Sequence, residues 1–249
     1  LDAQDADEDI SWDGVSTINL DGSLVLQPPL NPAGLAGQVW VDVDKSDGPG
    51  SGNVYVLASV QRSSNNDPLD VMFVKSIDGG FSWTEPMRIN DDPSTYEYQW
   101  FGSMSVAPNG RIDVIWLDTR EAFGNSYNSA LYYSFSLDQG ETWTASEKVS
   151  EIFDPSLGYP NQNKMGDYFH MVSDNEHAHL AWANTFNGEQ DVYYSRISHD
   201  IVGIDEKNSQ NQLSMNIYPN PNNGRFKLSY NLISNSDASI HIYDVYGKQ

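Results

Sequence analysis

The sequence predicts an all-β protein built from repeated units of four antiparallel strands. An eight-residue motif occurs twice, as SIDGGFSW at 76–83 and SLDQGETW at 136–143, a displacement of 60 residues. The same runs of alternating or aromatic-rich residues return around it, separated by turn-forming Gly, Asn, Asp and Pro. A fixed period of this size is typical of stacked supersecondary units, and four short strands per unit favour a β-propeller blade over a sandwich.

Both motifs share serine, aspartate, glycine and tryptophan positions that can close and cover a turn. The glycine can take a positive φ, the aspartate can accept hydrogen bonds from its own turn, and the tryptophan can bury its ring over the turn. These residues are Ser76, Asp78, Gly80 and Trp83 in the first motif, and Ser136, Asp138, Gly140 and Trp143 in the second. We therefore interpret all eight as structural residues of hairpin turns.

Each unit is expected to supply its strands in the same order. First strands are expected at 39–43, 103–107 and 169–173, second strands at 53–60, 111–118 and 177–184, and third strands at 70–75, 130–135 and 191–196. Short fourth strands should follow the motifs near 87–90 and 147–152, whereas the third unit lacks both the motif and an obvious fourth strand.

The three predicted blades occupy residues 37–200. Residues 1–36 are predicted to be a remnant of a preceding blade or a strand that closes the ring. Propellers typically have about 4–8 blades, so three units are too few for a closed ring. We expect either further blades before this sequence or association of three-blade chains.

The repeated frame Ser-x-Asp-x-Gly-x-x-Trp resembles the Asp-box, or bacterial neuraminidase repeat. The resemblance implies a sialidase-like propeller in which the box lies between the third and fourth strands of a blade, away from the ligand face. Sialidases of this family also need an arginine triad, a tyrosine nucleophile with its glutamate, and an acid/base carboxyl group. None of these can be assigned in this sequence.

A second module is predicted after the blades. Residues 201–212 are polar and form an expected linker, and residues 213–249 resemble the type A C-terminal sorting domain of type IX secretion, an incomplete small β-sandwich. The resemblance is carried by the motif residues Pro219, Asn220, Pro221, Gly224, Asp244 and Gly247. It implies a cargo, made with a signal peptide, that passes through the periplasm, meets the type IX secretion machinery and is secreted or attached to the cell surface.

The composition limits the possible partners. Thirteen Lys and Arg against 35 Asp and Glu give a net charge of −22, which argues against binding to nucleic acid or to an anionic membrane surface. No run approaches the roughly 18 apolar residues of a membrane-spanning helix. The sequence has no cysteine, so it offers no disulfide and no thiolate site.

Asp118 and Arg120 are candidates for a ligand face. They follow the second strand of the second unit, and an arginine there could bind a carboxylate such as that of a sialic acid through its planar fork. The alternative is a structural pair that braces the blade.

Two clusters have the composition of metal sites. The loop at 42–48 carries Asp42, Asp44 and Asp47 before a glycine, a density of oxygen ligands that suits Ca²⁺, although an ordinary acidic turn is the alternative. His177 and His179 would share one face of a strand, but a zinc site needs a third ligand, and the sequence shows no such partner. We therefore expect an ordinary, half-exposed histidine pair.

The leading functional hypothesis is a secreted or cell-surface protein whose sialidase-like propeller binds extracellular glycans or surface polymers. One alternative is an exo-glycosidase, most naturally an exo-α-sialidase, with most catalytic residues outside this chain. Another is a non-catalytic structural or adhesion propeller that contacts other proteins.

Overall fold

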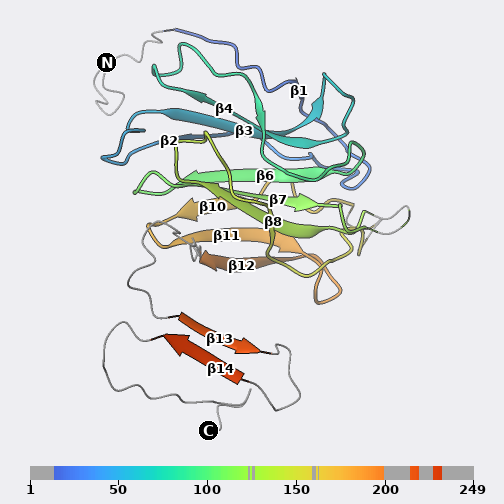
Figure 1. Cartoon of the computed structure of the whole chain (residues 1–249). Coiled ribbons are helices and arrows are strands. Elements are labelled where there is room, and N and C mark those ends of the chain that lie inside the picture. Colours follow the sequence, from blue (N-terminus) through green and yellow to red (C-terminus); the bar gives the residue numbers. More distant parts are fainter. Residues whose placement is uncertain are drawn as a thin grey trace, which may run out of the picture. The chain divides into compact units, whose positions relative to one another are not determined.

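The computed structural model describes residues 14–122, 124, 127–158, 161 and 163–198, and two later strands at 214–218 and 227–231. All of its regular elements are β-strands, and the strands within each sheet pair in antiparallel fashion. The chain divides into two units, residues 1–199 and 200–249. In the first unit three sheets follow one another in chain order (Figure 1).

The first sheet contains the four strands predicted for the first blade. These are β2 (Trp40–Val43), β3 (Val54–Arg62), β4 (Asp70–Ser76) and β5 (Met87–Arg88), paired in sequence order. A fifth strand, β1 (Gly22–Ser23), pairs with the end of β3. The segment before the blades therefore adds to the first sheet.

The second sheet repeats this order with β6 (Gln99–Val106), β7 (Ile112–Asp118), β8 (Ala130–Ser136) and β9 (Glu147–Lys148). β6 begins earlier than predicted because its register shifts between Trp100 and Ser103. Phe101 has a φ of 56° at this bulge, and both Trp100 and Phe101 are buried. The bulge interrupts the alternation of side chains from which a strand is predicted.

The third sheet has three strands, β10 (His170–Ser173), β11 (His177–Asn184) and β12 (Asp191–Ser198). Within the described part of the chain, β12 pairs with β11 alone. Residues 14–36 do not complete this sheet, so the structure does not show the ring-closing strand that was one of the two alternatives.

Two hydrophobic clusters join neighbouring sheets. One contains Phe73 from the first sheet and Trp116 from the second, and the other contains Phe101 from the second sheet and Trp182 from the third. Neighbouring sheets thus bury apolar side chains against each other, as blades of a propeller do. The predicted fold class, an all-β partial propeller of antiparallel blades, is confirmed.

The second unit contains a hairpin of β13 (Ser214–Tyr218) and β14 (Lys227–Asn231). Both strands fall within the predicted module at 213–249. The motif residues of that module, Pro219, Asn220, Pro221, Gly224, Asp244 and Gly247, lie outside the described residues. In the part of the chain that is described, no helix has the length and hydrophobicity needed to cross a membrane.

Candidate functional site

Each octapeptide motif forms the turn between the third and fourth strands of its sheet. In the first turn, the Gly80 N–H donates to Ser76 Oγ at 2.8 Å, and Asp78 Oδ1 accepts the Ser76 hydroxyl at 2.7 Å and the Ser82 N–H at 2.9 Å. Hydrogen bonds from Ser82 and Ser76 lower the pKa of Asp78 to about 2. The carboxylate is therefore engaged inside its own turn.

The second turn repeats these contacts. Asp138 Oδ1 accepts the Ser136 hydroxyl at 2.8 Å and the Thr142 N–H at 2.9 Å, and the Gly140 N–H donates to Ser136 Oγ at 2.9 Å. Trp143 lies edge-on to Phe73 of the first sheet, with ring centroids 5.2 Å apart. This turn therefore helps to join the two sheets.

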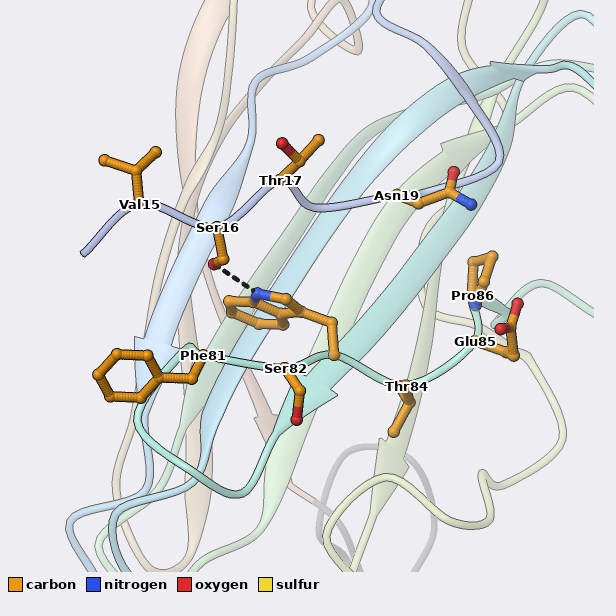
Figure 2. A pocket seen from close by; sticks show the side chains of 10 residues that line it. Val15, Ser16, Thr17, Asn19, Phe81, Ser82, Thr84, Glu85 and Pro86 are labelled. Atoms are coloured by element: carbon orange, nitrogen blue, oxygen red, sulfur yellow. Dashed lines mark hydrogen bonds between the residues drawn. The ribbon is translucent and has the colours of Figure 1, made fainter.

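The first turn is covered by the N-terminal segment instead. The Trp83 indole N–H donates to Ser16 Oγ at 2.9 Å, and Figure 2 shows the stretch from Val15 to Asn19 running across the turn. A cleft of about 420 Å³ lies between this stretch and residues 81–86. Its polar groups are largely those that close the turn.

The other end of the sheets carries Asp118 and Arg120, because successive turns of an antiparallel meander lie at opposite ends. Arg120 forms ion pairs of 2.8 Å with both Asp118 and Asp91, and its guanidinium lies 4.3 Å from the Tyr132 ring centroid. Burial lowers the pKa of Arg120, but the bonds to Asp118 and Asp91 outweigh this and raise it above its ordinary value.

Arg120 connects two sheets. Asp91 follows β5 of the first sheet and also accepts the Ser146 N–H at 2.9 Å. The equivalent arginine of the first sheet, Arg62, pairs with Asp21 and Asp70 at 2.7 and 2.8 Å. Both guanidinium groups are thus paired with carboxylates of the chain, which favours the bracing interpretation of Arg120 over direct binding of a ligand carboxylate.

A cleft of about 460 Å³ lies beside Thr119, between the connections that precede β6 and follow β7. Its lining residues come from these two connections and are Tyr96, Glu97, Tyr98, Thr119, Ala122, Gly124 and Tyr127. Tyr96 is 74% exposed, and Tyr98 and Tyr127 meet edge to face at 5.7 Å. The cleft therefore offers aromatic faces to solvent.

Glu97 supplies the carboxyl group of this cleft. Its Oε2 atom is buried and has no hydrogen-bond partner among the described residues. Burial raises the pKa of Glu97, and the carboxylates of Asp92 and Asp118 raise it further. The sequence does not single out this cleft, because Tyr96 to Tyr98 and Tyr127 belong to no repeat. The available signal was that these tyrosines lie in connections at the same end of one blade.

A second carboxyl group with a raised pKa lies deeper in the first sheet. Asp67 is 1% exposed, and its Oδ1 accepts the Leu69 N–H at 3.1 Å. Burial, together with the carboxylates of Asp70 and Asp92, raises the pKa of Asp67 to about 6. The folded protein therefore holds a proton on Asp67 more tightly than the unfolded chain does.

Asp67→Asn is expected to change the pH dependence of stability. The folded pKa is above the unfolded value of about 3.9, so in the wild type stability falls as pH rises from about 4 to about 6. The neutral amide removes this loss and should raise the free energy of unfolding at pH 7 by roughly 1–2 kcal/mol. Urea denaturation at pH 4 and pH 7 checks this, with the exposed Asp47→Asn as control; equal pH dependence in wild type and Asp67→Asn would contradict it.

In the predicted calcium loop, two of the three carboxylates accept hydrogen bonds from backbone N–H groups. Asp42 Oδ2 accepts the Val106 N–H at 2.8 Å, and Asp44 Oδ1 accepts the Ser46 N–H at 2.8 Å, while Asp47 is exposed. Among the described residues, these three carboxylates do not form a group whose ligand atoms converge. Backbone N–H groups thus engage Asp42 and Asp44, which favours the acidic-turn alternative for this loop.

The structure places a carboxylate beside His177 and His179, for which the sequence showed no third partner. Asp174, in the turn before β11, places a carboxylate oxygen within 4.8 Å of a ring nitrogen of each histidine. The pattern Asp-x-x-His-x-His was the missed signal, because a tight turn folds its first residue back onto the strand that follows.

Comparison with known families identifies the end of the chain. Residues 216–249 match the secretion system C-terminal sorting domain. This chain carries a sorting tail. The match lies within residues 213–249, the segment that resembles a type IX sorting domain, and such a tail directs a protein to secretion or to the outer surface. Comparison with curated proteins gives no match.

Several solved structures are similar to part of this chain at low identity. An unknown function protein from Dyadobacter fermentans shows 16% identity and a TM-score of 0.39, covering 67% of this chain and 38% of that one. A Hadza microbial sialidase shows 17% identity and a TM-score of 0.42, covering 65% of this chain and 32% of that one. Penicillium chrysogenum α-L-arabinanase, complexed with arabinobiose, shows 14% identity and a TM-score of 0.43, covering 66% of this chain and 47% of that one. The chain thus spans less than half the length of each.

Proposed function

We propose that this protein is a type IX secretion cargo whose propeller region binds extracellular glycans or surface polymers through the tyrosine-lined cleft. The observation that carries the proposal is the cleft itself, at the end of the blades opposite the motif turns, in a chain that ends in a sorting tail. The tail supports delivery through the periplasm to the outside of the cell, where polysaccharides are the abundant polymers.

The chemistry of the cleft suits a carbohydrate. Tyr96 and Tyr127 present exposed rings on which the apolar face of a sugar ring can lie, and their hydroxyl groups remain able to exchange hydrogen bonds. Glu97 offers a buried carboxyl oxygen that lacks a partner in the described structure and can accept or donate to a sugar hydroxyl. A few polar groups among aromatic walls are typical of small-molecule sites.

The carboxylates around Arg120 argue against the binding of an anionic polymer to its guanidinium group. Its guanidinium is paired with Asp118 and Asp91, and Glu97 adds a further acid beside it. A neutral or weakly charged glycan therefore suits the cleft better than a polyanion, since the whole chain carries a net charge of −22.

Tyr96→Ala is the direct test of the proposal. The full chain is applied to a glycan array of extracellular polysaccharides and sialylated oligosaccharides, and the strongest hit is titrated. Loss of an aromatic anchor is expected to weaken binding by about tenfold or more, and because Tyr96 is 74% exposed its removal should leave the fold intact. Phe81→Ala, an exposed aromatic at the motif end, should bind as wild type.

Two results would count against this assignment. Equal binding by wild type and Tyr96→Ala would place the glycan elsewhere, and absence of any binding would favour the structural or adhesion alternative. Turnover of a fluorogenic sialoside by the same chain, lost in Glu97→Gln, would instead support the exo-glycosidase alternative, in which a carboxyl group of raised pKa acts as the general acid.

A further inference from the structure

The third sheet brings together three side chains of the kinds that bind transition metals. Asp174 lies in the turn between β10 and β11, and His177 and His179 follow on one face of β11. One ligand atom from each lies within 4.8 Å of the other two. We infer that Asp174, His177 and His179 form a binding site for a divalent transition-metal ion of the Zn²⁺ class.

The distances between the histidine ring nitrogens and the carboxylate oxygens of Asp174 are close to ligand-to-ligand distances in metal sites. His179 Nε2 lies 2.9 Å from Asp174 Oδ2, and His177 Nδ1 lies 3.7 Å from Asp174 Oδ1. Ligand atoms bound tetrahedrally at about 2.0–2.2 Å from zinc are about 3.3–3.5 Å apart. The three ligand atoms, which lie within 4.8 Å of one another, are therefore near the spacing that a single ion would impose.

The carboxylate is already oriented for this role. Asp174 Oδ1 accepts the backbone N–H groups of Glu176 and His177 at 2.7 and 2.6 Å, which leaves Oδ2 directed at His179. The turn is held from the neighbouring sheet, because the buried Arg111 donates to the carbonyl oxygens of Asp174 and Asn175 at 2.9 and 3.0 Å. Such outer contacts fix a ligand before the metal arrives.

Tyr194 contacts the second ring nitrogen of His179. Its hydroxyl oxygen lies 2.7 Å from His179 Nδ1. When Nδ1 carries the proton and donates to this oxygen, Nε2 presents its lone pair toward Asp174 and the ion. A ligating histidine usually donates its other ring N–H to such a partner.

The equivalent strand positions of the second sheet hold different side chains. There the positions equivalent to His177 and His179 hold Arg111 and Asp113, which pair at 2.8 Å, and the Tyr133 hydroxyl reaches Asp113 at 2.6 Å. That pair is wholly buried. In the third sheet two imidazole side chains replace it on a half-exposed face, where an ion can enter from solvent.

The ligand types select the metal. Two imidazole nitrogens with one carboxylate suit Zn²⁺, Ni²⁺ or Cu²⁺, whereas Ca²⁺ and Mg²⁺ prefer oxygen ligands alone. Arg196 lies opposite His179 in the strand register, but it is exposed and can extend into water. Three protein ligands leave at least one coordination position open to water or to a donor outside this sheet.

The test is a titration of the full chain, without an affinity tag, with ZnCl₂ in a calorimeter. We expect about one Zn²⁺ per chain, not displaced by millimolar Ca²⁺, and a visible absorption band with Co²⁺ that reports nitrogen ligands. The double variant His177→Ala with His179→Ala should lose this binding, and Asp174→Asn should weaken it. Tyr194→Phe keeps all three ligands and should weaken binding by roughly tenfold or more.

His170→Ala is the matched control, because His170 is an exposed histidine on the adjacent strand β10 and is not one of the three ligands. It should bind Zn²⁺ as wild type does. Circular dichroism without metal checks that each variant is folded, so loss of binding cannot be mistaken for loss of structure. Wild-type affinity in the double histidine variant, or equal loss in His170→Ala, would overturn the inference.

Discussion

Asp113→Ala should lower the free energy of unfolding by about 3–5 kcal/mol. Asp113 and Arg111 are fully buried, and Arg111 Nε lies 2.8 and 3.0 Å from the two oxygens of Asp113. The Tyr133 hydroxyl donates to the same carboxylate at 2.6 Å. Removing the acid leaves a guanidinium charge and a phenol hydroxyl with one partner fewer in the dry space between sheets.

The double variant Arg111→Met with Asp113→Leu separates the charge effect from packing. It removes both charges and keeps apolar volume, so it should be clearly more stable than Asp113→Ala alone, as is found for other buried ion pairs. Urea denaturation followed by tryptophan fluorescence measures both. A single variant within about 1 kcal/mol of wild type, the range of an exposed pair, would contradict the expectation.

The strands could be predicted because the sequence repeats and alternates. The runs around 54–60, 112–118 and 178–184 have the same apolar spacing, and the two motifs set the register between units. The bounds of β1 and its pairing with β3 could not be predicted, since two residues carry no periodicity and the pairing depends on tertiary contacts. The bulge at Phe101 likewise depends on the packing between sheets.

For the candidate sites, too, contacts between residues near in sequence could be predicted and contacts between distant residues could not. Asp78 bonds within its own turn, so its role followed from the motif alone. Arg120 pairs with Asp91, 29 residues away, and Asp42 bonds to Val106, 64 residues away. These two distant contacts favour the bracing interpretation of Arg120 and the acidic-turn alternative for the loop, and no spacing rule reports them.

Gly140→Ala should destabilise the protein far more than Gly80→Ala, although both glycines hold the same place in their motifs. Gly80 and Gly140 have φ values of +92° and +79°, a region that costs an alanine about 1–2 kcal/mol. A Cβ on Gly140 would lie 2.6 Å from Phe73 Cε1, whereas on Gly80 its nearest contact would be 3.7 Å away, at Trp83.

The Phe73 ring cannot move aside to relieve this overlap. It stacks on Tyr55 with centroids 5.7 Å apart and meets Trp143 edge-on at 5.2 Å, and all three rings belong to the cluster that joins the first two sheets. Overpacking of such a core adds about 1–3 kcal/mol, so Gly140→Ala should lose about 2–5 kcal/mol in total. Thermal and urea unfolding of the two variants compares them directly. Equal losses of stability in the two variants would contradict this expectation. They would mean that the second motif closes its turn without joining the sheets, and that a Cβ at its glycine position causes no steric strain against Phe73.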